Sequence, residues 1–201
     1  MGKKLESNFT NMVLVLFLIT FIASSAVGYV HELTSEPIKA AKEQKQTKAI
    51  KDVIPIAFNN NPAQDMIKAQ INDKESFECY PAKKDGNLVG VAIKCNTMKG
   101  YGGEISIMVG FSMEGKITGY TVLKYQETPG LGAKMNNWFQ KTGKGNVMGM
   151  NPTEENMKVT KDGGQVDAIT AATISSRAFC DAMNRAAIAF AFVKNKVTNN
   201  L

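Results

Sequence analysis

The sequence has few of the residues from which metal centres and hydrolytic sites are built. It holds one histidine, His31, and three cysteines, none of which belongs to a Cys-x-x-Cys pair. These numbers exclude a zinc site made of Cys and His ligands and argue against an iron–sulfur centre bound by this chain. Because His31 directly follows a long apolar segment, a Ser–His–Asp hydrolase is also a poor fit.

Arginine is scarce as well. Only Arg177 and Arg185 are present, and the other basic residues are lysines spread along the chain. With 24 Lys and Arg against 18 Asp and Glu the net charge is +6, but there is no arginine-rich patch, so no nucleic-acid partner is expected. The 201 residues are 44% hydrophobic and 21% charged, which predicts one or two globular domains and excludes a disordered or collagen-like chain.

The N-terminal part of the chain contains a long stretch without charge. Its core, Met12–Val30, is 19 residues long and would span about 28 Å as a helix, enough to cross the hydrocarbon core of a bilayer. Two interpretations compete. One is a cleaved signal peptide with Lys3 and Lys4 as its basic start, and the other is a retained anchor that ends at the interfacial aromatic Tyr29. We favour the anchor.

Charge counting does not settle how this segment crosses the membrane. Two lysines precede the segment and four follow it within about 20 residues, and this excess of positive charge after the segment argues weakly against a cytoplasmic N-terminus. Long domains, however, cross the membrane largely regardless of their charge. The short N-terminal tail favours a cytoplasmic N-terminus at the cell membrane, with the rest of the chain outside the cytoplasm. Thr20, Ser24 and Gly28 recur every four residues, which either allows close approach of another membrane helix or is coincidence.

The rest of the chain predicts an α+β fold of antiparallel strands with flanking helices. Thr34 or Ser35, followed by Pro37, predicts the start of a helix that ends near Val53. Alternating apolar residues and turn signals predict strands at Phe77–Tyr80, Leu88–Cys95, Glu104–Ser112 and Lys116–Tyr125.

Two further helices are expected after these strands. A short one covers Ala133–Lys141, and a last one of about 18 residues begins near Ser176. Its apolar face at helical spacing is predicted to be core: Phe179, Met183, Ala186, Phe190 and Val193.

Cys79 and Cys95 fall on neighbouring strands of one predicted hairpin. In an oxidising compartment they could form a disulfide, but exported chains also carry unpaired thiols, so this pairing is left open.

Two short segments differ from ordinary core and ordinary loop. The first, Glu127–Lys134, lies between a predicted strand and a predicted helix, where a proline and two glycines fix a tight backbone with exposed amides. The second, Asp167–Ser176, leads into the last helix and is rich in hydroxyl groups. Free N–H groups and the positive end of a helix dipole favour a phosphate at such a position.

A purely structural interpretation of both segments is also open. In it, Ser175 or Ser176 caps the last helix, Thr170 and Thr173 are turn residues, and the Pro-Gly stretch is a loop.

The two motifs ETPGLG and DxxTxATxSS, about 40 residues apart behind one apolar segment, resemble those of the FMN-binding subunits of ion-translocating respiratory complexes. That family includes the subunit called G in Rnf-type complexes and the subunit called C in the sodium-pumping NADH:quinone oxidoreductase. The resemblance runs from the anchor through Gly100–Glu104 to the last helix, and a length near 200 residues favours the first of the two.

The resemblance implies FMN held covalently by a phosphoester to Thr173 and attached by a separate flavin transferase, with Asp167 as part of the recognised motif. No catalytic or metal-binding residue is expected. The family pattern commonly has glycine at the position of Ala171 and often histidine at the position of Tyr125. The other expected cofactor-binding residues are Glu127, Thr128, Gly130, Leu131, Gly132, Lys134, Thr170, Ala171, Ala172, Ser175 and Ser176.

A tether at Thr173 would fix only the phosphate end of the flavin, so another segment must position the ring. Glu127–Lys134 is the best candidate, with Leu131 over one ring face and Thr128 at a ring edge. Glu127 lies beside the flavin or caps this turn, and Lys134 either counters its charge or is simply solvated.

The implied function is that of an electron-carrying membrane subunit of a ferredoxin:NAD oxidoreductase that transports Na⁺ or H⁺, rather than a complete enzyme. Its partners would be the other membrane subunits of the Rnf complex. The alternatives are the quinone-oxidoreductase subunit, a stand-alone extracytoplasmic flavin reductase, and an anchored binding or scaffold protein without flavin. The expected domains are a cytoplasmic tail and transmembrane anchor (1–33), a helical stalk and linker (34–76) and an FMN-binding domain (77–201).

Overall fold

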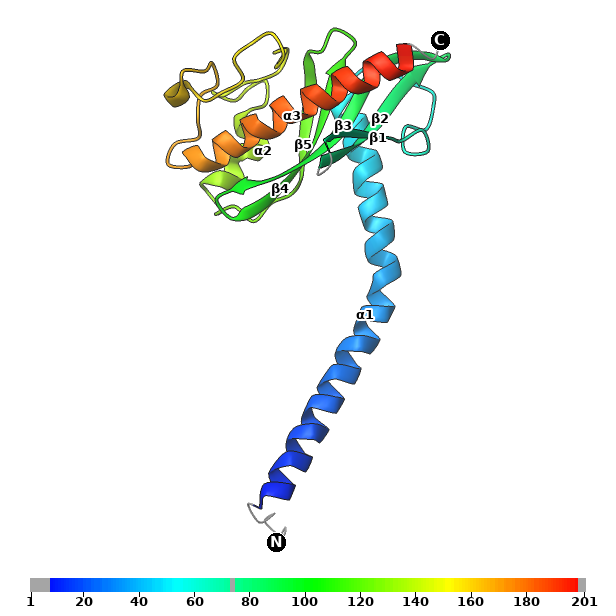
Figure 1. The fold of residues 1–201 in the computed structure, drawn as a ribbon, viewed down its shortest axis with the longest axis vertical. Helices are drawn as coiled ribbons and strands as arrows, with labels where there is room; N and C mark the ends of the chain where they lie inside the picture. Colours follow the sequence, from blue (N-terminus) through cyan, green and yellow to red (C-terminus); the bar gives the residue numbers. More distant parts are fainter. Residues whose placement is uncertain (1–7, 73–74, 199–201) are drawn as a thin grey trace. The chain divides into compact units, whose positions relative to one another are not determined.

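The structure is a computed structural model that describes residues 8–72 and 75–198. Its contacts divide the chain into two units, one up to Gln44 and one from Lys45 onward. The elements, in chain order, are α1 (Phe9–Val53), β1 (Ile67–Asn72), β2 (Glu75–Lys84), β3 (Asn87–Gly100), β4 (Gly103–Ser112), β5 (Ile117–Lys124), the 3₁₀ helix η1 (Gly132–Lys134), α2 (Met135–Trp138), the 3₁₀ helix η2 (Thr160–Asp162) and α3 (Thr173–Thr198) (Figure 1).

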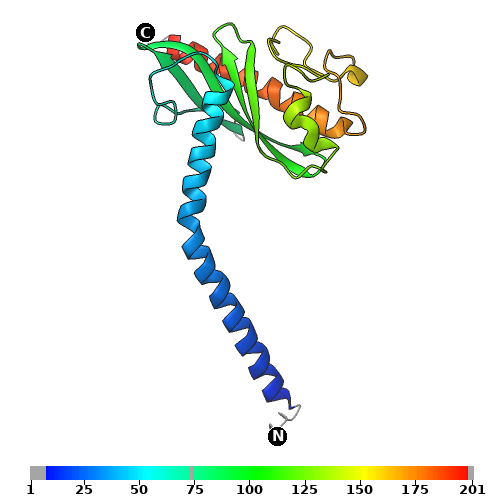
Figure 2. The same cartoon turned by 180° about the vertical axis from the view of Figure 1, so that it is seen from behind.

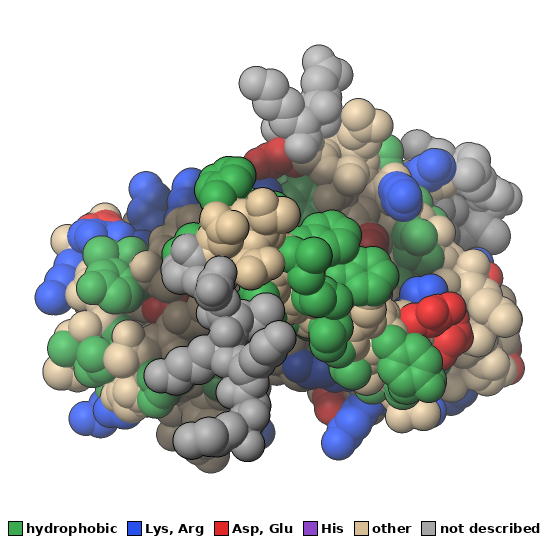
Figure 3. Space-filling view, turned by 90° about the horizontal axis from the view of Figure 1, so that it is seen from below, with side chains coloured by type: hydrophobic (Ala, Val, Ile, Leu, Met, Phe, Trp, Pro, Cys, Tyr) green, Lys and Arg blue, Asp and Glu red, His purple; other side chains and the backbone are tan. Residues whose placement is uncertain are grey.

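The N-terminal part of α1 is exposed and apolar. Within the described residues, α1 is the one helix whose length and composition suit a membrane span, and its most apolar stretch has no buried residue. Large hydrophobic side chains from Phe9 to Leu33 are more than a third exposed. Figure 3 shows hydrophobic side chains exposed at several places on the face that it draws.

The predicted helix start at Thr34 or Ser35 is wrong, because α1 runs through this point without a break and contains Pro37. The Thr34 hydroxyl donates to the Val30 carbonyl at 2.8 Å and the Ser35 hydroxyl to the Glu32 carbonyl at 3.1 Å, so both bond back along the helix. Proline removes one helix hydrogen bond, and exposure to solvent lets water replace it.

The α+β fold is confirmed. The sheet is an antiparallel meander in the order β1-β2-β3-β4-β5, and the four predicted strands are present as β2 to β5. Asp85 and Gly86 join β2 to β3 with φ angles of 52° and 84°, as a two-residue hairpin turn requires. β1 was not predicted, although Ile67, Ala69 and Ile71 alternate in its sequence, because lysine, glutamine and asparagine have low strand propensity.

α3 covers one face of the sheet (Figure 1). It begins at Thr173 rather than near Ser176 and has 26 residues. Its predicted core face is confirmed, since all five of those side chains are buried. The ring of Phe179 stacks on that of Phe139 with 4.1 Å between centroids, and Phe190 stacks on Phe111 of β4 at 5.3 Å.

The last turns of α1 cover the opposite face of the sheet, which Figure 2 shows from behind. Ile50 and Val53 pack there with Met108 of β4. A methyl group on Gly110 would overlap the Val53 carbonyl, so glycine allows the helix end to approach the strand backbone. Thr118 then donates a hydrogen bond of 2.6 Å to that carbonyl.

The predicted helix Ala133–Lys141 is shorter than expected. Only Gly132–Lys134 as η1 and Met135–Trp138 as α2 are helical. The chain turns back after Trp138 because the Gly145 amide donates to the Trp138 carbonyl at 3.1 Å, and a side chain on Gly143 would overlap the same carbonyl.

All three cysteines are free and buried, so the structure has no Cys79–Cys95 disulfide. Cys79 lies opposite Ile93 in the sheet register rather than opposite Cys95. Burial raises the pKa of Cys79, Cys95 and Cys180 to about 12, which keeps these thiols protonated and unreactive near neutral pH.

Candidate functional site

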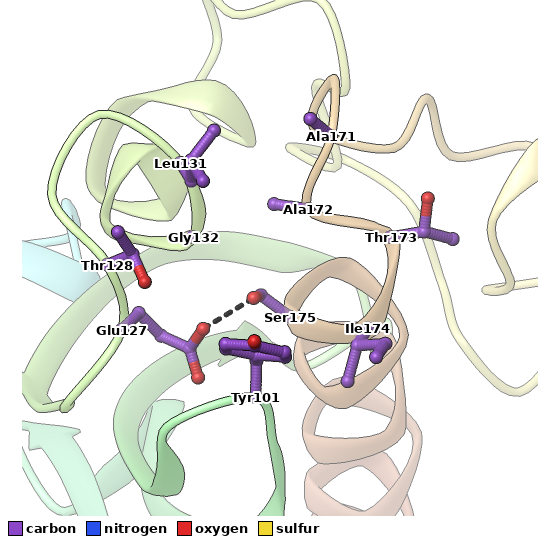
Figure 4. A pocket seen from close by; sticks show the side chains of 10 residues that line it. All are labelled: Tyr101, Glu127, Thr128, Leu131, Gly132, Ala171, Ala172, Thr173, Ile174 and Ser175. Atoms are coloured by element: carbon purple, nitrogen blue, oxygen red, sulfur yellow. Dashed lines mark hydrogen bonds between the residues drawn. The ribbon is translucent and has the colours of Figure 1, made fainter.

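The two motif segments meet at one pocket of about 440 Å³. Its walls come from the turn after β3, the segment after β5 and the start of α3 (Figure 4). The sheet and α3 therefore bring together segments that lie about 40 residues apart in sequence. The lining residues are Tyr101, Glu127, Thr128, Leu131, Gly132, Ala171, Ala172, Thr173, Ile174 and Ser175.

A buried carboxylate joins the three walls. Glu127 is only 5% exposed, and its Oε1 accepts a hydrogen bond from the Gly102 amide at 3.0 Å. Its Oε2 accepts one from the Ser175 hydroxyl at 2.5 Å (Figure 4). A methyl group on Gly132 would overlap both Glu127 Oε2 and Ser175 Oγ, so the glycine of the first motif makes room for this contact.

The serine cap of the last helix, part of the purely structural interpretation, is not present in the described structure. The Ser176 amide donates to the Ala172 carbonyl at 3.1 Å, which makes Ala172 the N-cap. The Ser176 hydroxyl is buried, accepts a hydrogen bond from the Ile169 amide at 2.9 Å and donates to Ala172 at 3.0 Å. Ser175 and Ser176 thus both use their hydroxyls inside the protein.

Thr173 differs from these two serines. It is the first residue of α3, half-buried, and lies at the rim of the pocket, while Ala172 points into it (Figure 4). Its Oγ1 accepts a long hydrogen bond of 3.4 Å from Nζ of Lys161 in η2. Thr173 is thus a half-buried residue of the pocket lining whose side chain points outward from the cavity (Figure 4). It belongs to α3 rather than to the turn ahead of the helix that the sequence predicts.

Ala171 lies in the left-handed region with φ of 61°. A residue with a Cβ in this conformation costs roughly 1–2 kcal/mol, a cost that glycine avoids. The glycine of the family pattern at this position thus has a backbone reason, and the chain keeps the same turn with alanine.

Several predicted site residues do not line the pocket. Gly130 has a φ of 77° with open space around its Cα, so its part is in the turn. The Asp167 carbonyl accepts a hydrogen bond from Trp138 Nε1 at 2.8 Å, which holds the second segment in place. Lys134, Thr170 and Tyr125 are exposed away from the pocket lining.

Sequence reasoning missed two apolar lining residues and one basic neighbour. Tyr101 is 71% exposed at the tip of the β3–β4 turn, and Ile174 is 49% exposed. An exposed tyrosine between glycines in the stretch Gly100–Gly103 was a signal that could have found the first. Lys161 carries no local signal, since only the folded chain brings it to Thr173.

No metal site accompanies the pocket in the described part of the chain, which holds no group of three His, Cys, Asp or Glu side chains arranged to bind an ion.

Comparison with known proteins identifies a flavin-binding class of protein. Residues 100–188, which carry all three of its walls, match the family described as the FMN-binding domain.

Relatives along nearly the whole chain narrow this further. The subunit designated G of the ion-translocating oxidoreductase complex of Vibrio cholerae is 33% identical over 187 residues, which cover 86% of each chain. The subunit designated G of the Na(+)-translocating ferredoxin:NAD(+) oxidoreductase complex of Acetobacterium woodii is 36% identical over 184 residues, covering 85% of this chain and 86% of the relative. The corresponding subunit of Shewanella piezotolerans is 31% identical over 196 residues, covering 92% and 90%. The chain belongs to the family of these subunits.

Proposed function

We propose that this chain is the electron-carrying flavoprotein subunit of a membrane-bound, ion-translocating ferredoxin:NAD oxidoreductase, with FMN held as a phosphoester of Thr173. Family membership supports the complex and the cofactor. The other membrane subunits of the complex are its partners in this proposal.

One observation supports Thr173 as the attachment residue. The second motif offers four hydroxyls, and one of them belongs to a pocket residue that is not buried. Ser175 and Ser176 are buried with their hydroxyls bonded to protein groups, and Thr170 does not line the pocket. Of these four residues, Thr173 alone is half-buried, lines the pocket and has a hydroxyl that is bonded only to an exposed lysine among the described residues.

The pocket also fits a flavin ring. Its volume lies within the usual range for small-molecule sites, and most of its wall is apolar. Tyr101, Leu131 and Ile174 offer apolar surface to a flat ring, while Glu127 and Thr128 offer polar groups at one side. Bound FMN would supply reversible acceptance and release of electrons, and the chain's own residues position it.

Attachment requires help from outside the chain. The contact of Thr173 Oγ1 is with a lysine ammonium, which has no lone pair with which to take the hydroxyl proton. A separate flavin transferase would supply the base. With a flavin adenine dinucleotide donor, Oγ1 bonds to the flavin-side phosphorus, the bond to adenosine monophosphate breaks, and the hydroxyl proton passes to the transferase.

The mass of the intact chain tests this proposal. A chain produced together with a flavin transferase should be heavier than its sequence by about 440 Da, one FMN less one water, with the addition on the peptide that contains Thr173. After denaturation the protein band should still fluoresce. An unmodified mass under these conditions, or flavin that is lost on denaturation, would contradict the proposal.

In the same proposal the N-terminus lies in the cytoplasm and the pocket lies outside it. Because the three native cysteines are buried, a single cysteine introduced at the exposed Lys144 reports on its own side of the membrane. In intact cells Lys144→Cys should react with a membrane-impermeant maleimide, and the parent chain should not. Reaction only after the membrane is opened would show the opposite orientation.

A further inference from the structure

We propose that Lys161 is the phosphate-binding residue of this site and that the Asp162–Arg177 ion pair holds it in position. This inference rests on the proposed attachment at Thr173 and adds a residue from outside both motifs. Three features of the described residues support this inference: the contact of the lysine ammonium with Thr173, the lack of an acidic partner for this lysine, and the rigidity of the segment to which it belongs.

The contact between Lys161 and Thr173 does little to stabilise the fold. Its ammonium is 3.4 Å from Thr173 Oγ1, near the outer limit for a hydrogen bond, between an exposed side chain and a half-exposed one. Such a contact contributes little to stability. A phosphate on Oγ1 would place anionic oxygens two bonds from that atom, where the same ammonium gains a charge-assisted hydrogen bond.

The charge of Lys161 is also uncompensated. In residues 8–72 and 75–198, no acidic side chain forms an ion pair with it. The neighbouring Asp162 is instead bound by Arg177, with Nε 2.7 Å from Oδ2 and Nη2 2.6 Å from Oδ1. Hydrogen bonding to the Arg177 guanidinium lowers the pKa of Asp162, so this carboxylate stays charged and engaged. A positive charge therefore remains next to Thr173.

The segment around Lys161 is held in place on both sides by contacts with the rest of the domain. Asp162 ties η2 to Arg177, which lies one helical turn after Thr173. On the other side, the Thr160 amide donates to Val166 at 2.9 Å, and the side chains of Val159 and Val166 are buried in the core. A lysine on such a segment approaches Thr173 with little loss of backbone freedom.

The test compares four full-length chains in detergent, prepared without flavin and then incubated with a purified flavin transferase and flavin adenine dinucleotide. Lys161→Met should slow the incorporation of flavin about tenfold, the size of effect expected for losing one charge-assisted hydrogen bond. Lys161→Arg keeps the cation and should restore most of the rate. Lys158→Met removes a charge from the same segment without contact to Thr173 and serves as the matched control. Thermal unfolding of the unloaded chains should differ little.

A second measurement separates a phosphate contact from a contact with the transferase. After complete loading, the ³¹P resonance of the phosphoester should shift in Lys161→Met and not in Lys158→Met. Asp162→Asn, which removes the ion pair and leaves Arg177 one acceptor instead of two, should shift the same resonance. Slow loading with an unchanged ³¹P resonance would assign Lys161 to recognition by the transferase and overturn the inference.

Failure of the inference and failure of the proposed function remain distinguishable. If the parent chain and Lys161→Met are loaded on Thr173 at equal rates with equal ³¹P resonances, the attachment stands and the role of Lys161 is wrong. If the parent chain accepts no flavin, or accepts it on another residue, the proposed function fails first.

Discussion

Replacement of Thr173 by valine should remove all protein-bound flavin that survives denaturation. Valine keeps the branched shape of threonine at the start of α3 but has no oxygen to esterify. The fold should remain, because the Thr173 hydroxyl bonds only to the exposed Lys161 in the described structure, and such surface changes usually alter the unfolding free energy by less than about 1 kcal/mol. Intact mass and in-gel fluorescence measure the first effect, and thermal unfolding measures the second.

Thr170→Val is the matched control for this variant. It removes a hydroxyl from the same motif, but from a side chain that is exposed and away from the pocket. Its flavin content should equal that of the parent chain. Full flavin content in Thr173→Val would show that Thr173 is not the attachment residue. Loss of flavin in Thr170→Val alone would show the same.

Replacement of Glu127 by alanine should give the largest loss of stability among the pocket residues. It leaves the partly buried Gly102 amide and the buried Ser175 hydroxyl without their partner and opens a cavity beside Gly132. Each unsatisfied buried group costs about 1–3 kcal/mol, so we expect the unfolding free energy to fall by about 3 kcal/mol. Denaturant-induced unfolding of the full chain measures this.

Two further variants bracket the effect of Glu127→Ala. Glu127→Gln keeps the shape and one acceptor and should lose less stability than alanine. Glu104→Ala removes a half-buried carboxylate that pairs with the exposed Lys124 at 2.6 Å, and a pair at the surface of this kind is worth at most about 1 kcal/mol. If Glu127→Ala and Glu104→Ala unfold at the same denaturant concentration, Glu127 does not hold the walls of the pocket together.

Local patterns predicted much of the fold. The alternation in β4 and the apolar face of α3 each reflect burial on one side, which a short stretch of sequence records directly. The first and last residues of the helices were harder to predict from the sequence. Pro37 and its neighbouring hydroxyls have the composition of a helix start, yet α1 continues because its exposed backbone loses little there. The short α2 depends on Gly143 and Gly145 packing against Trp138, a tertiary contact that no local pattern shows.

Part of the candidate site could be predicted from residue types that favour tight turns or phosphate binding, such as glycines and clustered hydroxyls. The two segments chosen for their glycines and hydroxyls do meet at one pocket, and eight of the residues named in them line it: Glu127, Thr128, Leu131, Gly132, Ala171, Ala172, Thr173 and Ser175. Which hydroxyl stays free was not predictable, because it depends on Glu127 binding Ser175 from 48 positions away. Lys161 escaped for the same reason, since its position depends on the Asp162–Arg177 pair.

Because the pocket is open at its rim, it need not bind the flavin ring tightly. Tyr101 and Leu131 leave much of their surface in solvent, so this cavity encloses a ligand only in part. With the flavin linked at Thr173 as proposed, the ring meets its pocket at an effective concentration in the millimolar range set by a short flexible linker. Even an intrinsic dissociation constant of ~0.1 mM would then keep the ring bound about nine-tenths of the time. A shallow site can thus stay occupied while one edge of the ring faces outward toward a neighbouring redox centre.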